Sequence, residues 1–513
     1  MRLAHKGAAG NRPPTGIFRP GYNHEQSRPV VVRLSGEHAP HVEGKAASLS
    51  TENAQPTNAD YTREYFSILE SLHGDVEGRR AARAYMQAST AICHHEVVES
   101  TFVPRLFGQR TYDVMKRTAE MAHRILVKVI EHYQADPDYR RAFSLDPRLE
   151  ELVCLPRGYD SVLPFARVDT FLNEDDFRCK FCEFNADGSS GMNENREITA
   201  SIAGSATFRE FAGHHQVAGC ELFESWVDTF LHIYGTYENR VASPRVAIVD
   251  FLENAVVDEF RVFAQLFERR GVPCAVADVR ELSFDGEVLR DGQGQRIDAV
   301  WRRCVTNDVI DHWDESQQLI DAVRAQKVAL IGSFAGHLAH DKQIFKVLFD
   351  PATTAFLDAD EVSFVEETVP LTAFLDDDYV NVPQIRANKD EWIVKPTDHY
   401  GADQVYAGCS LTQQEWEGVI DRFANGRAGY PFVVQRYIRP FKTETLPPDE
   451  GIEHLADSQV RTEPACYNNL NGLYLYDGTF TGVFSRLGPK PTISKDMQGI
   501  TAATIWVDVE AGE

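Results

Sequence analysis

The chain has 513 residues, 43% of them hydrophobic, and a formal net charge of −25. Its length is enough for roughly two to four domains, and its composition is ordinary for a globular protein. The acidic balance argues against nucleic acid or an anionic membrane surface as a partner, because both attract basic patches.

No run of the sequence approaches the roughly 18–20 apolar residues of a membrane span. No apolar segment follows Met1 as a secretory signal would require. The nine cysteines are scattered and show no disulfide spacing. We therefore expect a cytoplasmic protein with reduced thiols and no membrane partner.

Residues 1–55 are rich in Gly, Pro, Ser and Asn and show little periodicity, so we expect a flexible N-terminal extension. Residues 56–240 are expected to form a helical region that also carries a β-hairpin. The clearest helix is predicted over 111–133, where apolar residues recur at three- and four-residue steps.

Two apolar-rich runs flank an acidic turn and predict a β-hairpin at 167–187. Because strand side chains alternate, Arg167 and Asp169 share one face of the first strand. Glu183 and Asn185 share one face of the second. Oxygen ligands of this kind suit Mg²⁺ carrying a nucleotide phosphate, and a guanidinium suits an anion. A solvated strand face is the alternative interpretation.

Alternation places Cys182 on the opposite face of the second strand, together with Phe184. The single CxxC at 179–182 has no second pair to complete a zinc site. A Gly/Ser turn at 188–191 then leads into a helical pattern, and such a turn offers backbone N–H groups to an anion.

Residues 241–335 alternate strand-like and helix-like patterns. Buried strands are predicted at 245–251, 274–278, 297–301 and 328–332, and helices at about 256–267 and 317–325. This order predicts an α/β domain with a mainly parallel sheet. No GxGxxG turn follows its first strand, which argues against an ordinary dinucleotide site.

Residues 336–513 carry lysines at the ends of predicted elements. Lys342 lies near the start of a helix predicted over 340–349. Lys395 ends a predicted strand and precedes a turn that contains Gly401. Cations at such positions are available to a bound anion.

The last predicted strands carry further polar side chains. An apolar strand at 432–440 contains Gln435. A second hairpin at 472–487 turns at Asp477-Gly478, and Arg486 stands at the end of its second strand.

The order of these short blocks resembles that of the circularly permuted ATP-grasp ligases, in particular the synthetase half of glutathionylspermidine synthases. The resemblance spans about residues 85–505 but is concentrated in six blocks. These are Arg167-Val-Asp169, Glu183-Phe-Asn185, Asp341-Lys342, Lys395-Pro396 with Gly401, Gln435 to Ile438, and Arg486 before Ile493.

The resemblance implies an α/β (α+β) fold, a circularly permuted ATP-grasp, with 241–335 as a pre-ATP-grasp domain and 336–513 as the nucleotide-binding region. It also implies ATP and Mg²⁺ as cofactors. Mg²⁺ would be held by Asp169, Glu183 and Asn185. The nucleotide would be contacted by Lys342, Lys395, Gly401 and the backbone of Gln435, Arg436, Tyr437 and Ile438. Arg167 and Arg486 would stabilise the transferring phosphoryl group.

The implied activity is an ATP-dependent carboxylate–amine ligase. It would join two small molecules, amino acids or an amino acid and an amine, through an acyl-phosphate, and release ADP and phosphate. A γ-glutamyl or other dipeptide-like product is the favoured guess from the family. The expected partners are these substrates and, in a homodimer, a second copy of the chain.

The chain departs from the family pattern in the loop after Lys395, where Asp398 and Tyr400 stand near the expected phosphate position. A catalytically inactive nucleotide-binding module is therefore one alternative. A phosphotransferase that stops at the phosphorylated substrate is another.

Overall fold

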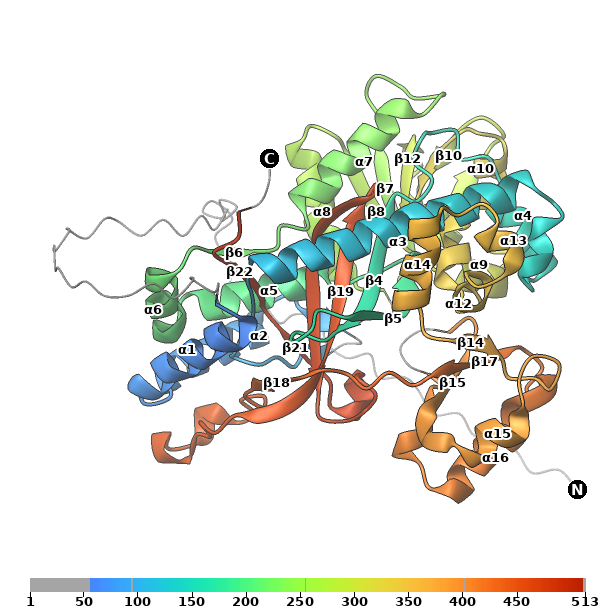
Figure 1. Ribbon diagram of the computed structural model, residues 1–513. Coiled ribbons are helices and arrows are strands. Elements are labelled where there is room, and N and C mark those ends of the chain that lie inside the picture. Colours follow the sequence, from blue (N-terminus) through green and yellow to red (C-terminus); the bar gives the residue numbers. More distant parts are fainter. Residues whose placement is uncertain (1–55, 94–95, 254, 400–402, 511–513) are drawn as a thin grey trace, which may run out of the picture.

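The computed structural model describes residues 56–510 apart from 94–95, 254 and 400–402. The extension predicted at 1–55 and the predicted nucleotide contact Gly401 therefore lie outside the described residues. The described part is a mixed α/β structure of helices and several sheets (Figure 1). None of its helices is both long enough and apolar enough to cross a membrane.

A six-stranded sheet lies at the centre of the molecule. Its strands are β4 (Phe165–Leu172), β5 (Cys179–Asn185), β18 (Lys442–Thr445), β19 (Ala465–Tyr476), β20 (Thr479–Gly488) and β21 (Ile500–Ala502). They follow the order β21-β20-β19-β4-β5, β18 also pairs with β19, and every pairing is antiparallel. The two predicted hairpins are confirmed, and they lie side by side in this sheet (Figure 1).

The register of the first hairpin places the predicted polar residues together. Arg167 lies opposite Asn185, and Asp169 lies opposite Glu183. Directly opposed residues project from the same face of an antiparallel sheet. The prediction that one face of the hairpin presents all four side chains is therefore confirmed.

A β-bulge interrupts the alternation of β5. The pairing passes from Glu183 directly to Phe181, so Cys182 is the extra residue. Both Phe181 and Phe184 enter the hydrophobic core, but Cys182 does not. The prediction that Cys182 shares a face with Phe184 is therefore wrong, because the bulge adds one residue to the strand. The carbonyl of Cys182 instead accepts a hydrogen bond from Lys395 Nζ at 3.3 Å.

One long helix, α3 (Gln109–Ala135), crosses the central sheet and confirms the helix predicted over 111–133 (Figure 1). Its buried stripe includes Met115, Ala119, Ala122, Ile125, Leu126, Val129 and Tyr133. These side chains share one core with apolar residues of β4, β5, β19 and β20. The helix α14 (Ala359–Thr368) closes the same core beside β5.

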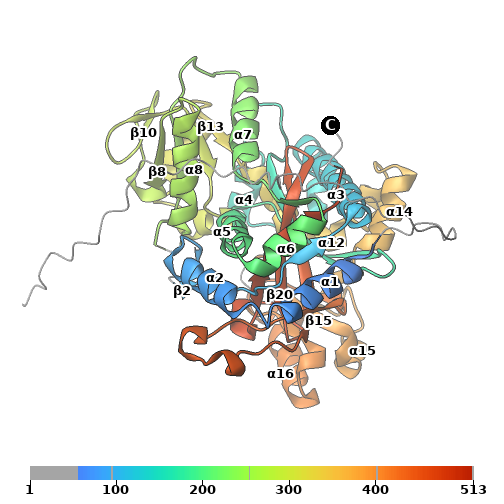
Figure 2. The same ribbon diagram turned by 90° about the vertical axis from the view of Figure 1, so that its left-hand side faces the viewer.

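A second sheet lies within residues 241–335 and is parallel throughout, as predicted. Its strands are β7 (Val246–Asp250), β8 (Cys274–Asp278), β12 (Ala299–Arg302) and β13 (Ala329–Ile331), in the order β13-β12-β7-β8. The helices α7 (Glu224–Thr236), α8 (Val257–Arg269), α9 (Thr306–Asp311) and α10 (Gln317–Arg324) accompany it. Figure 2 shows α7 and α8 beside this sheet.

A third, smaller sheet lies near the lower right of Figure 1. Its strands are β14 (Thr372–Phe374), β15 (Trp392–Pro396), β16 (Tyr406–Ala407) and β17 (Phe432–Arg436), in the order β14-β17-β15-β16. The helices α15 (Val382–Ala387) and α16 (Gln413–Phe423) cover it and share its core. The strand predicted over 432–440 ends at Arg436.

Helices from the first half of the chain form a further layer, with α1 (Asn58–Ser71), α2 (Val76–Ala88), α5 (Met192–Ala203) and α6 (Ala206–His214). The strand β22 (Thr504–Val507) pairs with β3 (Arg105–Phe107) and β6 (Val217–Gly219). Residues 504–507 are thereby packed against two segments of the first half of the chain. Because the central sheet also draws strands from both regions, the predicted divisions 56–240 and 336–513 stay predictions.

The helix predicted over 340–349 is wrong as a single element. Two short helices take its place, α11 (His337–His340) and α12 (Ile344–Val347). The carboxylate of Asp341 accepts the backbone N–H of Gln343 at 2.8 Å. The backbone N–H of Lys342 donates to the carbonyl of Thr397 at 2.8 Å. Because these donors are satisfied outside an α-helical ladder, the helix is interrupted at Lys342.

Candidate functional site

The site begins with a buried carboxylate held between two arginines. Asp169 Oδ1 accepts a hydrogen bond from Arg167 Nε at 2.8 Å, and Oδ2 accepts one from Arg167 Nη2 at 3.3 Å. Arg486 of β20 forms an ion pair with the same Asp169 Oδ2. Arg167 also donates to the carbonyl of Ser190 at 2.7 Å. These bonds fix both guanidinium groups on one face of the sheet.

A glycine makes room for this pair. Gly472 lies opposite Asp169 in the register of β19 and β4. A Cβ atom at Gly472 would lie 2.7 Å from Arg167 Cδ and 2.8 Å from Asp169 Oδ1. Arg167 therefore occupies the space where any other residue would place its side chain.

We predict that Gly472→Ala displaces Arg167. It should lower the turnover of the ligase reaction that the sequence resemblance implies by at least ~10-fold, since a misplaced charged group stabilises a transition state poorly. Steady-state kinetics check this. Gly418→Ala is the matched control, because a Cβ there meets nothing within 4 Å in the middle of α16. Unchanged kinetics in Gly472→Ala would contradict a role for the position of Arg167.

Lys395 is buried at the end of β15 and is fixed by two acceptors. Its Nζ donates to Gln435 Oε1 at 2.9 Å and to the carbonyl of Cys182 at 3.3 Å. Gln435 is held in turn, because its Nε2 donates to Thr372 Oγ1 at 2.9 Å. An ammonium group has three N–H donors, so one remains for a ligand. Gln435 therefore positions Lys395, a role that its sequence position did not reveal.

Lys342 is equally buried and is tied to the loop that follows Lys395. Its Nζ donates to the carbonyl of His399 at 2.7 Å. With its backbone N–H on Thr397, this makes two bonds from one residue to one loop. The position of the Lys342 ammonium is thus coupled to the conformation of residues 397–399.

The pKa of Glu183 is lowered by the cations that were predicted to bind the nucleotide and the phosphoryl group. Burial by itself raises its pKa, but nearby positive charges outweigh burial and lower the pKa to about 2. Those charges are, in order of effect, Lys342, Arg486, Lys395 and Arg167. They come from four separate segments of the chain and face two carboxylates, Asp169 and Glu183. The result is a surplus of positive charge inside an acidic protein, which suits a polyanionic ligand.

The residues predicted to bind Mg²⁺ differ in what they offer. Asn185 Nδ2 donates to Glu183 Oε1 at 3.3 Å, and within the described part of the chain nothing donates to Asn185 Oδ1. An amide oxygen beside a carboxylate is a donor set that Mg²⁺ accepts. Both oxygens of Asp169 accept from arginines instead. Glu183 and Asn185 thus fit the ion. Metal binding by Asp169 stays a prediction, because Arg167 or Arg486 would first have to release one of its carboxylate oxygens.

The segment whose backbone is predicted to contact the nucleotide runs from Gln435 to Ile438 at the end of β17. Arg436 pairs with Glu391, and its guanidinium lies 4.4 Å from the ring centre of Trp392. The backbone N–H of Tyr437 donates to the carbonyl of Glu391 at 2.9 Å. The side chain of Arg436 is therefore engaged with Glu391 and Trp392 and is not free for a base.

The sequence did not single out Glu194, a buried residue in the first turn of α5. Burial and the nearby charge of Glu259 raise its pKa to about 7, although Arg167, Arg486 and Lys495 oppose them. The same two arginines act on Glu183. Glu194 therefore borders the site. The helical pattern around it in the sequence did not indicate that it lies near Arg167 and Arg486.

The start of α5 was also predicted to offer backbone N–H groups to an anion. Glu259 Oε2 already accepts the backbone N–H of Asn193 at 3.0 Å. Arg303 Nη2 holds Glu259 Oε1 at 3.1 Å. The anion at this helix end is thus a side chain of the protein itself.

We predict a pH-dependent effect of Glu194→Gln on stability. Because the folded protein raises the pKa of Glu194 from 4.5 to about 7, the stability present below pH 4.5 is lost as the pH rises towards 7. The variant should therefore raise the melting temperature more at pH 8 than at pH 5. Glu77→Gln, at an exposed site in the first turn of α2, is the control and should show no such difference. Equal shifts at both pH values for Glu194→Gln would contradict the prediction.

Comparison with solved structures shows which known proteins have a similar fold. No family model matches the chain, and no curated protein matches its sequence. A glutathione synthetase-like effector from Globodera pallida, in its apo form, matches with a TM-score of 0.56 at 10% identity, over 84% of this chain and 96% of that one. The described chain thus shares the mixed α/β fold of that effector.

Two weaker structural matches are also found. A putative gamma-glutamylcysteine synthetase from Methylobacillus flagellatus matches with a TM-score of 0.39 at 10% identity, over 76% of this chain and 88% of that one. A D-cycloserine synthetase matches with a TM-score of 0.26 at 13% identity, over 52% of this chain and 92% of that one.

Proposed function

We propose that the protein is an ATP-dependent carboxylate–amine ligase that forms an amide bond between two small molecules. The observation that carries the proposal is a cluster of four cations from separate segments. Arg167 and Arg486 pair with Asp169, which lies opposite Glu183 in the sheet, and Lys395 donates to the carbonyl of Cys182 beside Glu183. Together with Lys342 they lower the pKa of Glu183. The fold shared with a glutathione synthetase-like protein supports the same class. The circularly permuted ATP-grasp arrangement, with 241–335 as its pre-ATP-grasp domain, belongs to this proposal.

In this proposal Lys342 and Lys395 bind the phosphates of ATP, and the backbone at 435–438 lines the adenine pocket. Each lysine is already anchored by acceptors on neighbouring segments, so little ordering is needed when the nucleotide binds. Mg²⁺, held by Glu183 and Asn185 with Asp169 as the predicted third ligand, would neutralise phosphate charge and polarise the γ-phosphoryl group.

The reaction has two steps. A carboxylate oxygen of the first substrate attacks the γ-phosphorus of ATP, the bond to the bridging oxygen breaks, and ADP leaves. The amine of the second substrate then attacks the acyl carbon, the bond to the phosphate oxygen breaks, and phosphate leaves as the amine loses its proton. Arg167 and Arg486, held by Asp169, stabilise the charge that spreads over oxygens in both steps.

The substrates are proposed to be amino acids, or an amino acid and an amine. A γ-glutamyl or other dipeptide-like product is the specific case. This is an inference from the chemistry that such ligases perform, and a search by mass spectrometry for products from paired amino-acid mixtures identifies the pair.

The proposal is tested with ATP, Mg²⁺ and a panel of amino acids and amines. We expect release of ADP and phosphate that depends on the carboxylate substrate, and a hydroxamate when hydroxylamine replaces the amine. A stable phosphorylated product without a hydroxamate would indicate a phosphotransferase instead. Nucleotide binding without turnover of any pair would indicate an inactive module and would contradict the ligase.

A further inference from the structure

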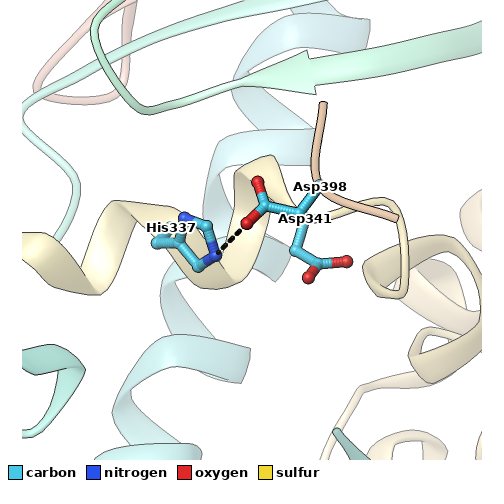
Figure 3. Close-up of side chains that lie close together, drawn as sticks. All are labelled: His337, Asp341 and Asp398. Atoms are coloured by element: carbon cyan, nitrogen blue, oxygen red, sulfur yellow. Dashed lines mark ion pairs between the residues drawn. The ribbon is translucent and has the colours of Figure 1, made fainter. Parts of the chain in front are cut away.

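Three side chains outside the cation cluster meet beside the loop that follows β15 (Figure 3). His337 belongs to α11, Asp341 follows that helix directly, and Asp398 belongs to the loop. One ligand atom from each lies within 4.8 Å of the other two. Within the described ranges, this is the group of metal-ligating side chains that lies close enough to share one ion.

The histidine is oriented in the way that metal-binding histidines are. His337 is fully buried, and its Nδ1 lies 3.2 Å from Asp187 Oδ2. Asp187 is itself held by Arg302 Nη1 at 2.5 Å. In metal-binding histidines, a carboxylate on one ring nitrogen orients the ring so that the other nitrogen faces the ion. Among the residues that the structure describes, none forms a hydrogen bond with His337 Nε2, which lies 3.5 Å from Asp398 Oδ2 and faces the cluster.

The two carboxylates are also prepared for a ligand. Asp341 accepts the backbone N–H of Gln343 at 2.8 Å and Gln343 Nε2 at 3.0 Å, which fixes the orientation of its carboxylate. Each oxygen keeps a second lone pair. The side chain of Asp398 is 18% exposed, so one of the three ligands is accessible to solvent.

We propose that His337, Asp341 and Asp398 bind a divalent transition-metal ion, with Zn²⁺ as the best match. One imidazole nitrogen and two carboxylate oxygens form a donor set that Zn²⁺ accepts, with water at the remaining position. Mg²⁺ fits less well, because it prefers oxygen ligands throughout. The site shares no ligand with the magnesium site proposed at Glu183.

The ion would join the loop to α11. Asp398 lies between Thr397 and His399, whose carbonyls accept the backbone N–H and Nζ of Lys342. A metal that holds Asp398 therefore also fixes the acceptors of Lys342. The effect on ATP binding through Lys342 rests on the proposed function, whereas metal binding by the three side chains does not.

The test uses the full chain, treated with a chelator and then titrated with Zn²⁺ alone in a calorimeter, without nucleotide. We expect one site of micromolar or tighter affinity, and at least a tenfold loss of affinity in His337→Gln and in Asp398→Asn. Co²⁺ in place of Zn²⁺ should give visible absorption bands that both variants lose. His399→Gln, in the same loop, is the matched control and should bind normally.

Glu183→Gln separates this site from the proposed nucleotide site and should bind Zn²⁺ as the unaltered protein does. If the buried His337→Gln variant fails to fold, the Zn²⁺ affinity of Asp398→Asn tests the site instead. Absence of Zn²⁺ binding, or binding that Asp398→Asn leaves unchanged, would overturn the inference. Amide formation that persists without Zn²⁺ binding would overturn this inference alone, and Zn²⁺ binding without amide formation would overturn the proposed function alone.

Discussion

Replacing Lys395 by methionine is expected to lower the rate of amide formation on the order of 10²–10³-fold, judged from the loss of one charge-stabilising donor in other active sites. Methionine keeps the length and packing of the side chain but removes the ammonium group that donates to Gln435 Oε1 and the carbonyl of Cys182. The measurement is ADP release at saturating substrates, with circular dichroism to confirm the fold.

Lys389→Met is the matched control for this variant. Lys389 lies in the turn just before β15, and its Nζ pairs with Asp390 and donates to the carbonyl of Gly408 at 3.1 Å. It has no part in the cation cluster around Glu183. A near-normal rate for Lys395→Met would remove the main support for the assignment of the phosphate site.

The second large effect concerns stability. Asp169→Asn should lower the free energy of unfolding by about 3–5 kcal/mol, because the buried Arg167 and the partly buried Arg486 lose the carboxylate with which they form ion pairs. The lower end of this range is expected, since the Arg486 side chain is 25% exposed to water. Urea denaturation at pH 7 measures the change.

The control for Asp169→Asn comes from the same hairpin. Asp176 pairs with Arg178 at 2.5 Å on the exposed turn between β4 and β5. Exposed pairs contribute little, so Asp176→Asn should leave the free energy of unfolding nearly unchanged. Equal losses in the two variants would show that burial of the Asp169 pair does not matter.

Local patterns predicted the elements that build the site. Apolar periodicity indicated α3, and alternation with a polar turn indicated the hairpin that carries Asp169 and Glu183. The strand and helix order of 241–335 indicated a parallel sheet. In each case the signal lies within a short window, because burial of one face determines where apolar residues stand.

Features that depend on distant contacts were not predictable in this way. The break at Lys342 arises because Thr397 accepts its backbone N–H, and Thr397 lies on another segment. The bulge at Cys182 likewise has no signature in its own residues, although its carbonyl receives Lys395. The sequence placed Asp169, Arg167 and Arg486 at one ligand site, but it did not show that both arginines pair directly with Asp169.

The direct test of the central claim is a crystal structure of the protein with Mg²⁺ and a non-hydrolysable ATP analogue. We predict that the phosphates lie within hydrogen-bonding distance of Lys342, Lys395 and Arg486, with Mg²⁺ on Glu183 and Asn185. A nucleotide bound elsewhere on the molecule, with the cations around Glu183 arranged as they are now, would contradict the account.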